Sequence, residues 1–357
     1  MVRNGLWLLL MLCAVASVLA SCVIGPWNID MQDVATAVGG ALGLMDASAL
    51  PDAVRAVVVD LRLARAVLAL GVGAALAMAG ATFQAVLQNP LADPFTLGVS
   101  AGAALGATLV IGLGVRLEEL GALAGLAPYL AGLSLSALPL AALLGGLSTL
   151  AAVLLLGRRA GSLSRETLVL AGVVVSSVLA ACITLVKAVH EEAVGAMVFW
   201  IMGSLQGRGW GHVALFLPFF VVGGLILARY ARELDLLALG EEQAMLLGVD
   251  APRIRLLLLC GATMVTAAAV AVSGIIGFVG LVAPHAFRLW LKPRSRSLLA
   301  ASALGGGVLL VWSDVLARTL LATDTGGMEL PVGVVTALLG GPFFCMLLGR
   351  GPVRRPA

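Results

Sequence analysis

Ten apolar stretches, each close to the length of one membrane crossing, set the strongest limit on how this chain can fold. About 20 apolar residues of α-helix cross a ~30 Å hydrocarbon core. The stretches cover residues 6–25, 63–86, 96–115, 130–157, 167–187, 212–231, 256–273, 275–291, 298–321 and 331–349. Only 11% of the residues are charged and 61% are hydrophobic, whereas soluble domains are about 25% charged. We therefore predict an all-α polytopic membrane protein with ten transmembrane helices, built as one domain over residues 1–357.

Two segments between the long stretches differ in character. Residues 26–60 are polar, and their apolar positions at helical spacing are Ile29, Val34, Val38 and Leu42. We expect a short amphipathic helix on the outer membrane face, with a plain connecting loop as the alternative. Residues 194–207 are too short and Gly-rich for a full span, so we expect a short helix that is either re-entrant or at the membrane surface.

Two boundaries rest on small residues. Ser273-Gly274 and Gly277 separate the seventh stretch from the eighth, because glycine can turn the chain where other residues cannot. The first stretch reads Leu19-Ala20-Ser21-Cys22 near its end, which resembles a signal-peptide or lipoprotein cleavage site. We interpret it as a first membrane helix that ends in small residues.

The placement of cations predicts the orientation of the chain. Ten spans put both termini on one side of the membrane. With the N-terminus inside, fifteen of the 22 Lys and Arg residues fall in inner segments. Cytoplasmic loops carry an excess of Lys and Arg, so we expect both termini to be cytoplasmic.

Two segments of the chain resemble each other. Residues 74–90 and 268–284 align without gaps, and Gly80 then matches Gly274 while Pro90 matches Pro284. The second and seventh spans are five crossings apart and so point in opposite directions. We predict an inverted repeat of helices 2–5 and 7–10, a plan that recurs among transporters.

The sequence lacks the motifs of several other classes of protein. It has no HExxH and no CxxC, which leaves no signature of a metal site, and no paired catalytic carboxylates. The net charge of +3 and the absence of a basic run exclude a nucleic-acid partner. Only Lys187 and Lys292 are present and neither follows a glycine, so there is no phosphate-binding P-loop. We expect no catalytic residue and no bound cofactor, and any ATP that drives the protein must bind another chain.

Several motifs occur in a fixed order along the chain. They are Arg62-Leu63-Ala64-Arg65, NPLADP with FTLGVSAGAALGA (89–107), LGEEQAMLLGVDAPRIR (239–255), GIIGFVGLVAPHAFRL (274–289), DVLAR (314–318) and ELPVGVVTALLGGPFF (329–344). Together they resemble the FecCD family of ABC importer permeases, from about residue 60 to 349. One departure is Ala64, where the family usually has proline.

The resemblance implies a function and a set of partners. The family moves iron-siderophores, haem and cobalamin across the bacterial inner membrane. It implies a homodimer of permeases, two cytoplasmic ATPase subunits that bind ATP and Mg²⁺, and a periplasmic substrate-binding protein. We expect an iron chelate, siderophore or haem, as the substrate, with cobalamin as the alternative. Residues 26–60 then form a periplasmic loop and residues 232–255 a cytoplasmic coupling loop.

The resemblance also implies roles for three groups of residues. The residues implied to dock onto the ATPase are Gly240, Glu241, Glu242, Met245, Leu247, Gly248 and Val249. Docking of the binding protein falls to Arg62, Arg65 and Arg318. The translocation path or gate falls to Asn89, Pro90, Asp93, Leu170, Gly172, Ser176 and Ser177.

Each group has a simpler interpretation. The coupling residues would also suit an ordinary amphipathic loop helix, and arginines at helix ends commonly extend toward lipid headgroups. The small residues of the fifth span suit helix packing, and the two prolines suit a structural turn. Asp314 and Arg318 are four residues apart and suit an internal ion pair. A secondary transporter and an intramembrane enzyme remain as alternatives, although Asp314 is nearly alone as an intramembrane carboxylate.

Overall fold

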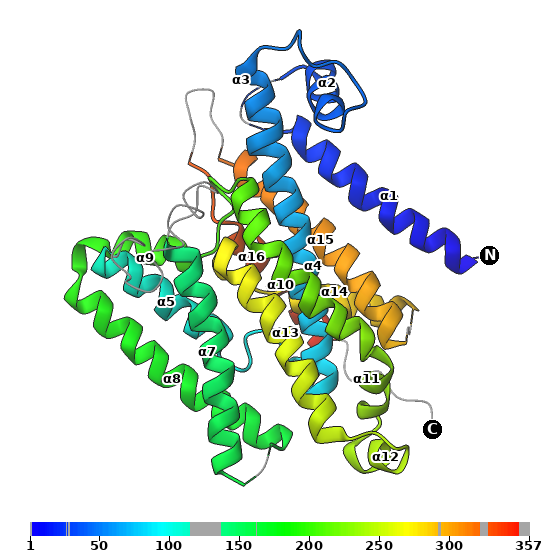
Figure 1. The fold of residues 1–357 in the computed structure, drawn as a ribbon, viewed down its shortest axis with the longest axis vertical. Helices are drawn as coiled ribbons and strands as arrows, with labels where there is room; N and C mark the ends of the chain where they lie inside the picture. The colour runs from blue at the N-terminus through cyan, green and yellow to red at the C-terminus, as the bar shows by residue number, and fades with distance from the viewer. Residues whose placement is uncertain are drawn as a thin grey trace.

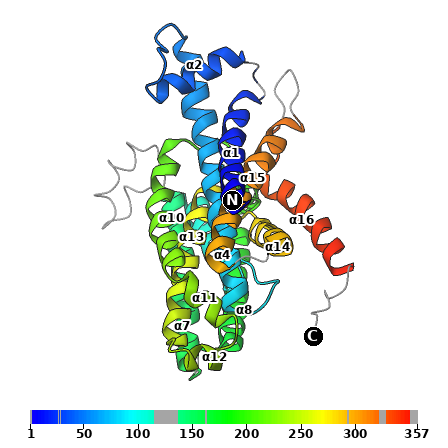
Figure 2. The ribbon, with the colours of Figure 1, turned by 90° about the vertical axis from the view of Figure 1, so that its right-hand side faces the viewer.

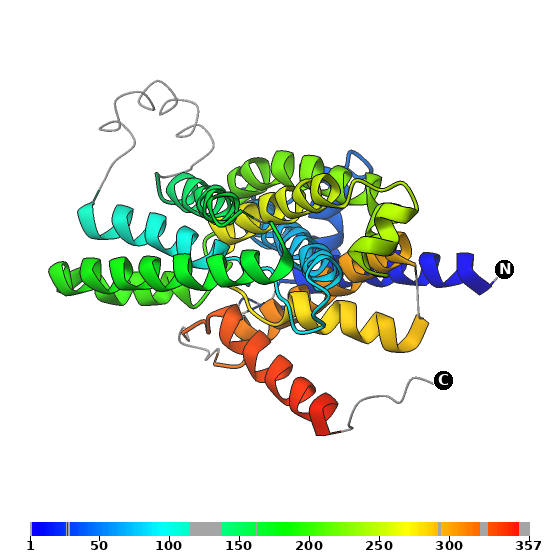
Figure 3. The same ribbon diagram turned by 90° about the horizontal axis from the view of Figure 1, so that it is seen from below.

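The computed structural model describes residues 2–25, 27, 29–114, 137–161, 163–291, 294–321 and 328–349, and the regular elements within them are helices. In order these are α1 Val2–Val23, α2 Met31–Ala41, α3 Asp52–Arg55, a π-helical segment Ala56–Leu63, α4 Ala64–Val86, α5 Val99–Leu113, α7 Ala137–Arg159, α8 Arg165–Val189, a 3₁₀ turn Glu191–Ala193, α9 Val194–Ile201, α10 Trp210–Arg229, α11 Ala231–Leu237, α12 Glu241–Leu246, α13 Ala251–Ser273, α14 Val279–Leu291, α15 Ser295–Thr319 and α16 Val332–Gly349. Figures 1 and 2 show an elongated helical bundle, with α2 at one end and α12 at the other, and Figure 3 shows the bundle from below.

Each of the ten predicted apolar stretches contains a helix, and the all-α membrane fold is confirmed. Within the described residues, seven helical segments are long and apolar enough to cross a membrane. Helices α5 and α16 are shorter apolar helices, and α14 has 13 residues. The number of complete crossings therefore stays a prediction. Residues 130–136 of the fourth stretch lie outside the described residues.

Helices α4 and α13 form the centre of the bundle. Helix α4 packs against α10, α13, α14 and α15, and both central helices are buried over most of their length. Small residues allow the backbones to approach closely, since a Cβ added at Gly73 would lie 2.3 Å from the carbonyl oxygen of Gly306. The same reasoning applies at Gly80, where an added Cβ would lie 1.9 Å from the Gly280 oxygen.

The two central helices run in opposite directions, as an inverted repeat requires (Figure 1). The ungapped alignment of residues 74–90 with 268–284 pairs Gly80 with Gly274, but these two glycines occupy different places in their helices. Gly80 lies inside α4, whereas Gly274 ends α13 with a φ of +70°. The predicted matches of residue types therefore do not mark equivalent positions in the two helices.

The segment before the second predicted span is largely helical. The expected amphipathic helix is present as α2, and its Val34 and Val38 are buried in a small cluster with Cys22 and Val58. Its apolar face thus covers the protein, and Leu42 at its end is exposed. One helical segment runs from Asp52 to Val86, so the helix begins before residue 63 and is longer than the ~20 residues of one crossing. The start of the second span at residue 63 stays a prediction.

The break between the seventh and eighth stretches is confirmed. Helix α13 ends at Ser273, and Gly274 follows it with a φ of +70°, which glycine adopts more readily than other residues. The Ser204 amide donates to the Ser273 carbonyl over 2.7 Å, so the chain after α9 lies against this break. The expected short helix in residues 194–207 is α9, which has eight residues.

Candidate functional site

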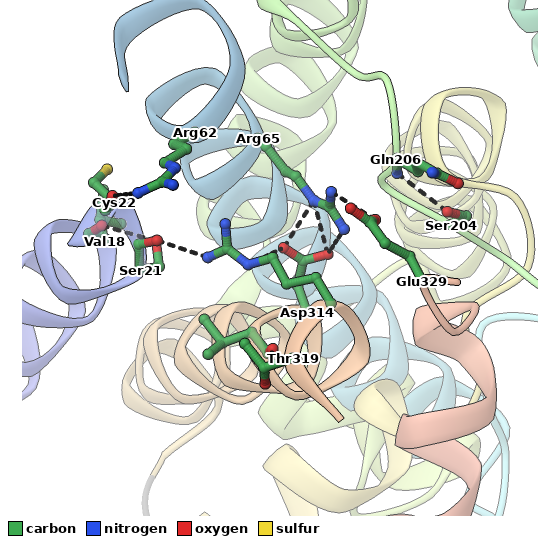
Figure 4. Close-up of polar contacts among 12 residues, drawn as sticks. Val18, Ser21, Cys22, Arg62, Arg65, Ser204, Gln206, Asp314, Thr319 and Glu329 are labelled. Carbon is green, nitrogen blue, oxygen red and sulfur yellow. Dashed lines mark hydrogen bonds and ion pairs between the residues drawn. The ribbon is translucent and has the colours of Figure 1, made fainter. Parts of the chain in front are cut away.

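An arginine of α4 binds two carboxylates from distant parts of the chain at the α2 end of the bundle. Arg65 Nε lies 2.9 Å from Asp314 Oδ2, and Nη2 lies 2.8 Å from Asp314 Oδ1. The other guanidinium nitrogen, Nη1, donates to Glu329 Oε2 over 2.9 Å. Figure 4 shows the Arg65 guanidinium between the two acids. Because Asp314 lies on α15 and Glu329 precedes α16, this one side chain joins three parts of the bundle.

Two further arginines bind the C-terminal end of α1. Arg62 Nη1 donates to the Cys22 carbonyl over 2.9 Å and to the Val23 carbonyl over 3.2 Å, and Nη2 donates to Trp27. Arg318 Nη2 donates to the Ser21 carbonyl over 2.7 Å. The last carbonyls of a helix have no partner within it, so these arginines satisfy acceptors that would otherwise be unpaired.

A cavity of about 370 Å³ opens beside these arginines. Its lining residues are Trp27, Val57, Leu61, Arg62, Arg65, Gln206, Gly207, Arg208, Arg318 and Glu329. Arg208 is half-buried, its Nη1 lies 3.0 Å from His212 Nε2, and its Nε has no hydrogen-bond partner. Burial lowers the pKa of Arg208 from its usual value. Among the described residues, the four arginines that line the cavity (Arg62, Arg65, Arg208 and Arg318) outnumber the two carboxylates nearby, Asp314 and Glu329. The cavity therefore carries an excess of positive charge.

The structure brings the three predicted docking residues together. Arg62, Arg65 and Arg318 all line the cavity, but each already binds groups of its own chain. Their contact with a binding protein stays a prediction. The expected Asp314–Arg318 pair is long, at 3.9 Å, and Arg65 is the closer partner of Asp314. Sequence reasoning missed Glu329 and Arg208, because no local spacing relates them to the other residues.

The predicted coupling residues lie on a short helix and its two ends. Helix α12 runs from Glu241 to Leu246, and the glycines that flank it, Gly240 and Gly248, have φ of +121° and +83°. These left-handed backbones require glycine, so they fix where the helix begins and where the chain leaves it. We call residues 239–249 the coupling segment.

The coupling segment exposes apolar side chains at the α12 end of the bundle. Its exposed apolar residues are Leu239, Met245, Leu246 and Leu247. Ala244 is fully buried and Val249 packs against the core, so the helix is anchored on one side. Leu246 is the most exposed of the set at 87%. Exposed apolar residues grouped on one helix suit contact with a partner protein.

The loop after α4 holds the predicted residues Asn89, Pro90 and Asp93 in tight turns. The Asn89 side chain accepts from the Leu91 amide over 2.9 Å, and Asp93 Oδ1 accepts from the Phe95 amide over 3.0 Å. Burial raises the pKa of Asp93, while the hydrogen bond from Thr96 opposes the rise. These contacts are those of a structural turn, and a role in gating stays a prediction.

The four residues predicted on α8 divide between two faces. Leu170 and Ser177 are exposed, along with Val173 between them. Gly172 is buried, and a Cβ added there would lie 2.8 Å from the Thr96 carbonyl oxygen. Ser176 is half-buried and faces Gly98. Gly172 and Ser176 thus pack against the 89–98 loop, and the exposed face of α8 carries Leu170 and Ser177.

Comparison with known proteins agrees with this architecture. The FecCD transport family matches residues 11–350. The cobalamin import system permease protein BtuC of Halobacterium salinarum is 42% identical over 305 residues, which cover 85% of this chain and 76% of that protein. The hemin transport system permease protein HmuU of Yersinia pestis is 38% identical over 305 residues, covering 84% and 85%.

A solved structure has the same fold. An inward-facing conformation of an ABC transporter assigned to the metal-chelate type superposes with a TM-score of 0.80 at 30% sequence identity. The match covers 97% of this chain and 99% of that one. The fold therefore defines a membrane permease of the ABC importer class. The chain belongs to the FecCD transport family, whose members are permease subunits without an ATP site of their own.

Proposed function

We propose that this protein is the transmembrane subunit of a homodimeric ABC importer that moves an iron chelate, a siderophore or haem, across the bacterial inner membrane. The observation that carries the proposal is the exposed apolar helix α12 in a chain that belongs to the FecCD transport family. ATP and Mg²⁺ would bind two separate ATPase subunits. Substrate would pass between two copies of the chain, along the exposed face of α8.

The ATPase would dock at the α12 end, which we place in the cytoplasm. Leu246 and its exposed neighbours would bury against the partner, since apolar anchors of this kind dominate the energy of protein interfaces. Helix α1 begins near mid-height and runs toward the α2 end, and α16 runs toward the α12 end (Figures 1 and 2). These directions support cytoplasmic termini, in agreement with the predicted positive-inside orientation.

The binding protein would dock at the α2 end, over the arginine-lined cavity. Arginine binds a carboxylate through two parallel hydrogen bonds, so acidic side chains of the partner suit this surface. Arg65 and Arg318 pair with Asp314, whereas Arg208 lines the same cavity and, among the described residues, its side chain hydrogen-bonds only to His212. We therefore propose that Arg62, Arg65 and Arg318 contribute positive charge there and that Arg208 makes a direct contact.

Cobalamin is the second candidate substrate. The 42% identity to a cobalamin permease favours it, while the similarity to a hemin permease favours haem. An iron chelate, haem and cobalamin are all bulky metal chelates. A wide path lined by small and apolar residues, such as Leu170 and Ser177, would pass any of them without tight binding.

Reconstitution tests the function. The chain would be co-expressed with its ATPase, purified in detergent and placed in proteoliposomes with the cognate binding protein. One set of proteoliposomes receives an iron–siderophore or haem and a second set receives cobalamin. We expect ATP-dependent uptake in the first set, and uptake in the second set instead if cobalamin is the substrate. Uptake driven by an ion gradient without ATP would contradict the proposal, as would failure of the chain to co-purify with the ATPase.

A further inference from the structure

A buried arginine joins the coupling segment to the beginning of α8. Arg255, on α13, donates from Nη1 to the Leu163 carbonyl over 2.8 Å and from Nη2 to the carboxylate of Glu241. Its side chain is 5% exposed. Glu241 is the first residue of α12, and Leu163 lies two residues before α8. One guanidinium thus binds both segments at once.

A second side chain makes a parallel connection. Gln88, just after α4, donates from Nε2 to the Leu237 carbonyl over 2.8 Å, and its Oε1 accepts from Arg165. Leu237 ends α11, two residues before the coupling segment begins, and Arg165 is the first residue of α8. Gln88 has a φ of +48°, an uncommon backbone for a residue other than glycine.

We infer that Arg255 and Gln88 are positioning residues that transmit movement of α12 to α8. The inference rests on the proposed function, in which α12 docks onto the ATPase and α8 lines the path. Charge-assisted hydrogen bonds are short and directional, and a helix moves as a rigid body with its first turn. A displacement of α12 would therefore shift the beginning of α8 and, with it, the face that carries Leu170 and Ser177.

The two connections start from opposite sides of the coupling segment. Arg255 acts from the helix that follows the segment, and Gln88 acts from the loop that follows α4. Both end within the three residues from Leu163 to Arg165. Arg255 thus joins the coupling segment itself, and Gln88 joins the end of α11 just before it, to one short stretch of chain. Loss of one connection would weaken the coupling, and loss of both would weaken it further.

The test measures the ratio of substrate transported to ATP hydrolysed by the complete complex in proteoliposomes. Arg255→Gln removes the charge, and Gln88→Asn shortens the side chain while keeping a residue type that tolerates the left-handed backbone. We expect each variant to assemble with the ATPase and to lower the ratio at least about fivefold, with a larger loss in the double variant. Arg158→Gln, an exposed arginine at the end of α7, is the matched control and should keep the wild-type ratio.

A second readout separates transmission from a purely structural role. Spin labels at the exposed Glu166 of both protomers report the position of the first turn of α8. ATP should change their separation in the wild type and less in Arg255→Gln, and Arg255→Lys should restore part of the response. An unchanged ratio and an unchanged label response in both variants would overturn the inference. A wild-type complex without ATP-dependent uptake would overturn the proposed function instead.

Discussion

Arg65 and Asp314 form a bidentate ion pair between α4 and α15, although 249 positions separate them in the sequence. The pair is almost fully enclosed, since the side chains are 11% and 3% exposed. Such a pair contributes little compared with an apolar pair of the same shape, but loss of one partner leaves a buried charge. The arginine cluster at the α2 end is therefore sensitive to single substitutions.

Asp314→Asn should strongly destabilise the protein. It leaves Arg65 with Glu329 as its remaining carboxylate partner among the described residues, and breaking a buried pair in this way costs about 3–5 kcal/mol. Thermal unfolding of the purified protein in detergent measures the effect. Asp52→Asn is the control, because its ion pair with Arg55 is exposed and should leave the unfolding temperature unchanged. Equal unfolding temperatures for the two variants would contradict the role given to Arg65.

Charge changes at the cavity should weaken docking of the binding protein. Arg208→Gln should lower the affinity roughly tenfold and reduce its dependence on salt, because a rim charge acts mainly on the association rate. Arg65→Glu should weaken docking too, but it should also lower the unfolding temperature, since it places a third acid beside Asp314 and Glu329. A pull-down and a binding assay at two salt concentrations test both variants. Unchanged affinity in both would exclude this surface as the docking site.

Leu246→Ser should prevent the ATPase from co-purifying without affecting the fold. An exposed apolar anchor at an interface contributes ~2 kcal/mol or more, which is about a 30-fold change in affinity. Because Leu246 is 87% exposed, its replacement should leave the unfolding temperature of the isolated permease unchanged. Leu44→Ser, at the α2 end and 77% exposed, is the control and should co-purify normally.

Asp93 should make stability depend on pH in the opposite sense from most carboxylates. Burial raises its pKa in the folded state, so the folded protein holds the proton to a higher pH than the unfolded chain, where the value is about 3.9. Stability should therefore fall as pH rises from the unfolded pKa toward the raised folded one. Asp93→Asn keeps an acceptor for the Phe95 amide and should lack this fall. Unfolding temperatures of the two proteins across this pH range should diverge, and parallel curves would contradict the prediction.

Gly80→Ala should destabilise the centre of the bundle. The added methyl would lie 1.9 Å from the Gly280 carbonyl oxygen, and overpacking of this kind costs about 1–3 kcal/mol. The matched control is Gly224→Ala on α10, where the nearest atom, in Met78, would be 3.8 Å away. Unfolding in detergent should separate the two variants, with Gly224→Ala as stable as the wild type or more so.

Part of the candidate site could be predicted from the sequence because its signals are local. The coupling segment combines two acids, apolar residues and two glycines within a few positions, and the structure has a short exposed helix there. The chain break at Ser273-Gly274 is likewise local, because the φ of +70° at Gly274 depends on the residue type itself. Arg255 and Gln88 gave no such signal, since their partners lie elsewhere in the chain.

The sequence by itself determined that the protein is helical and membrane-embedded, since apolar stretches of this length can satisfy their backbone only as helices in lipid. It also determined the order of the helices and the glycines at which the chain turns. Only the tertiary structure decided which face of each helix is covered and which charges meet. Gly172 and Leu170 are two positions apart on α8, yet one is buried against the 89–98 loop and the other is exposed. In a chain that is apolar on every side, hydrophobicity does not distinguish lipid from protein, so backbone contacts and buried ion pairs fix the arrangement.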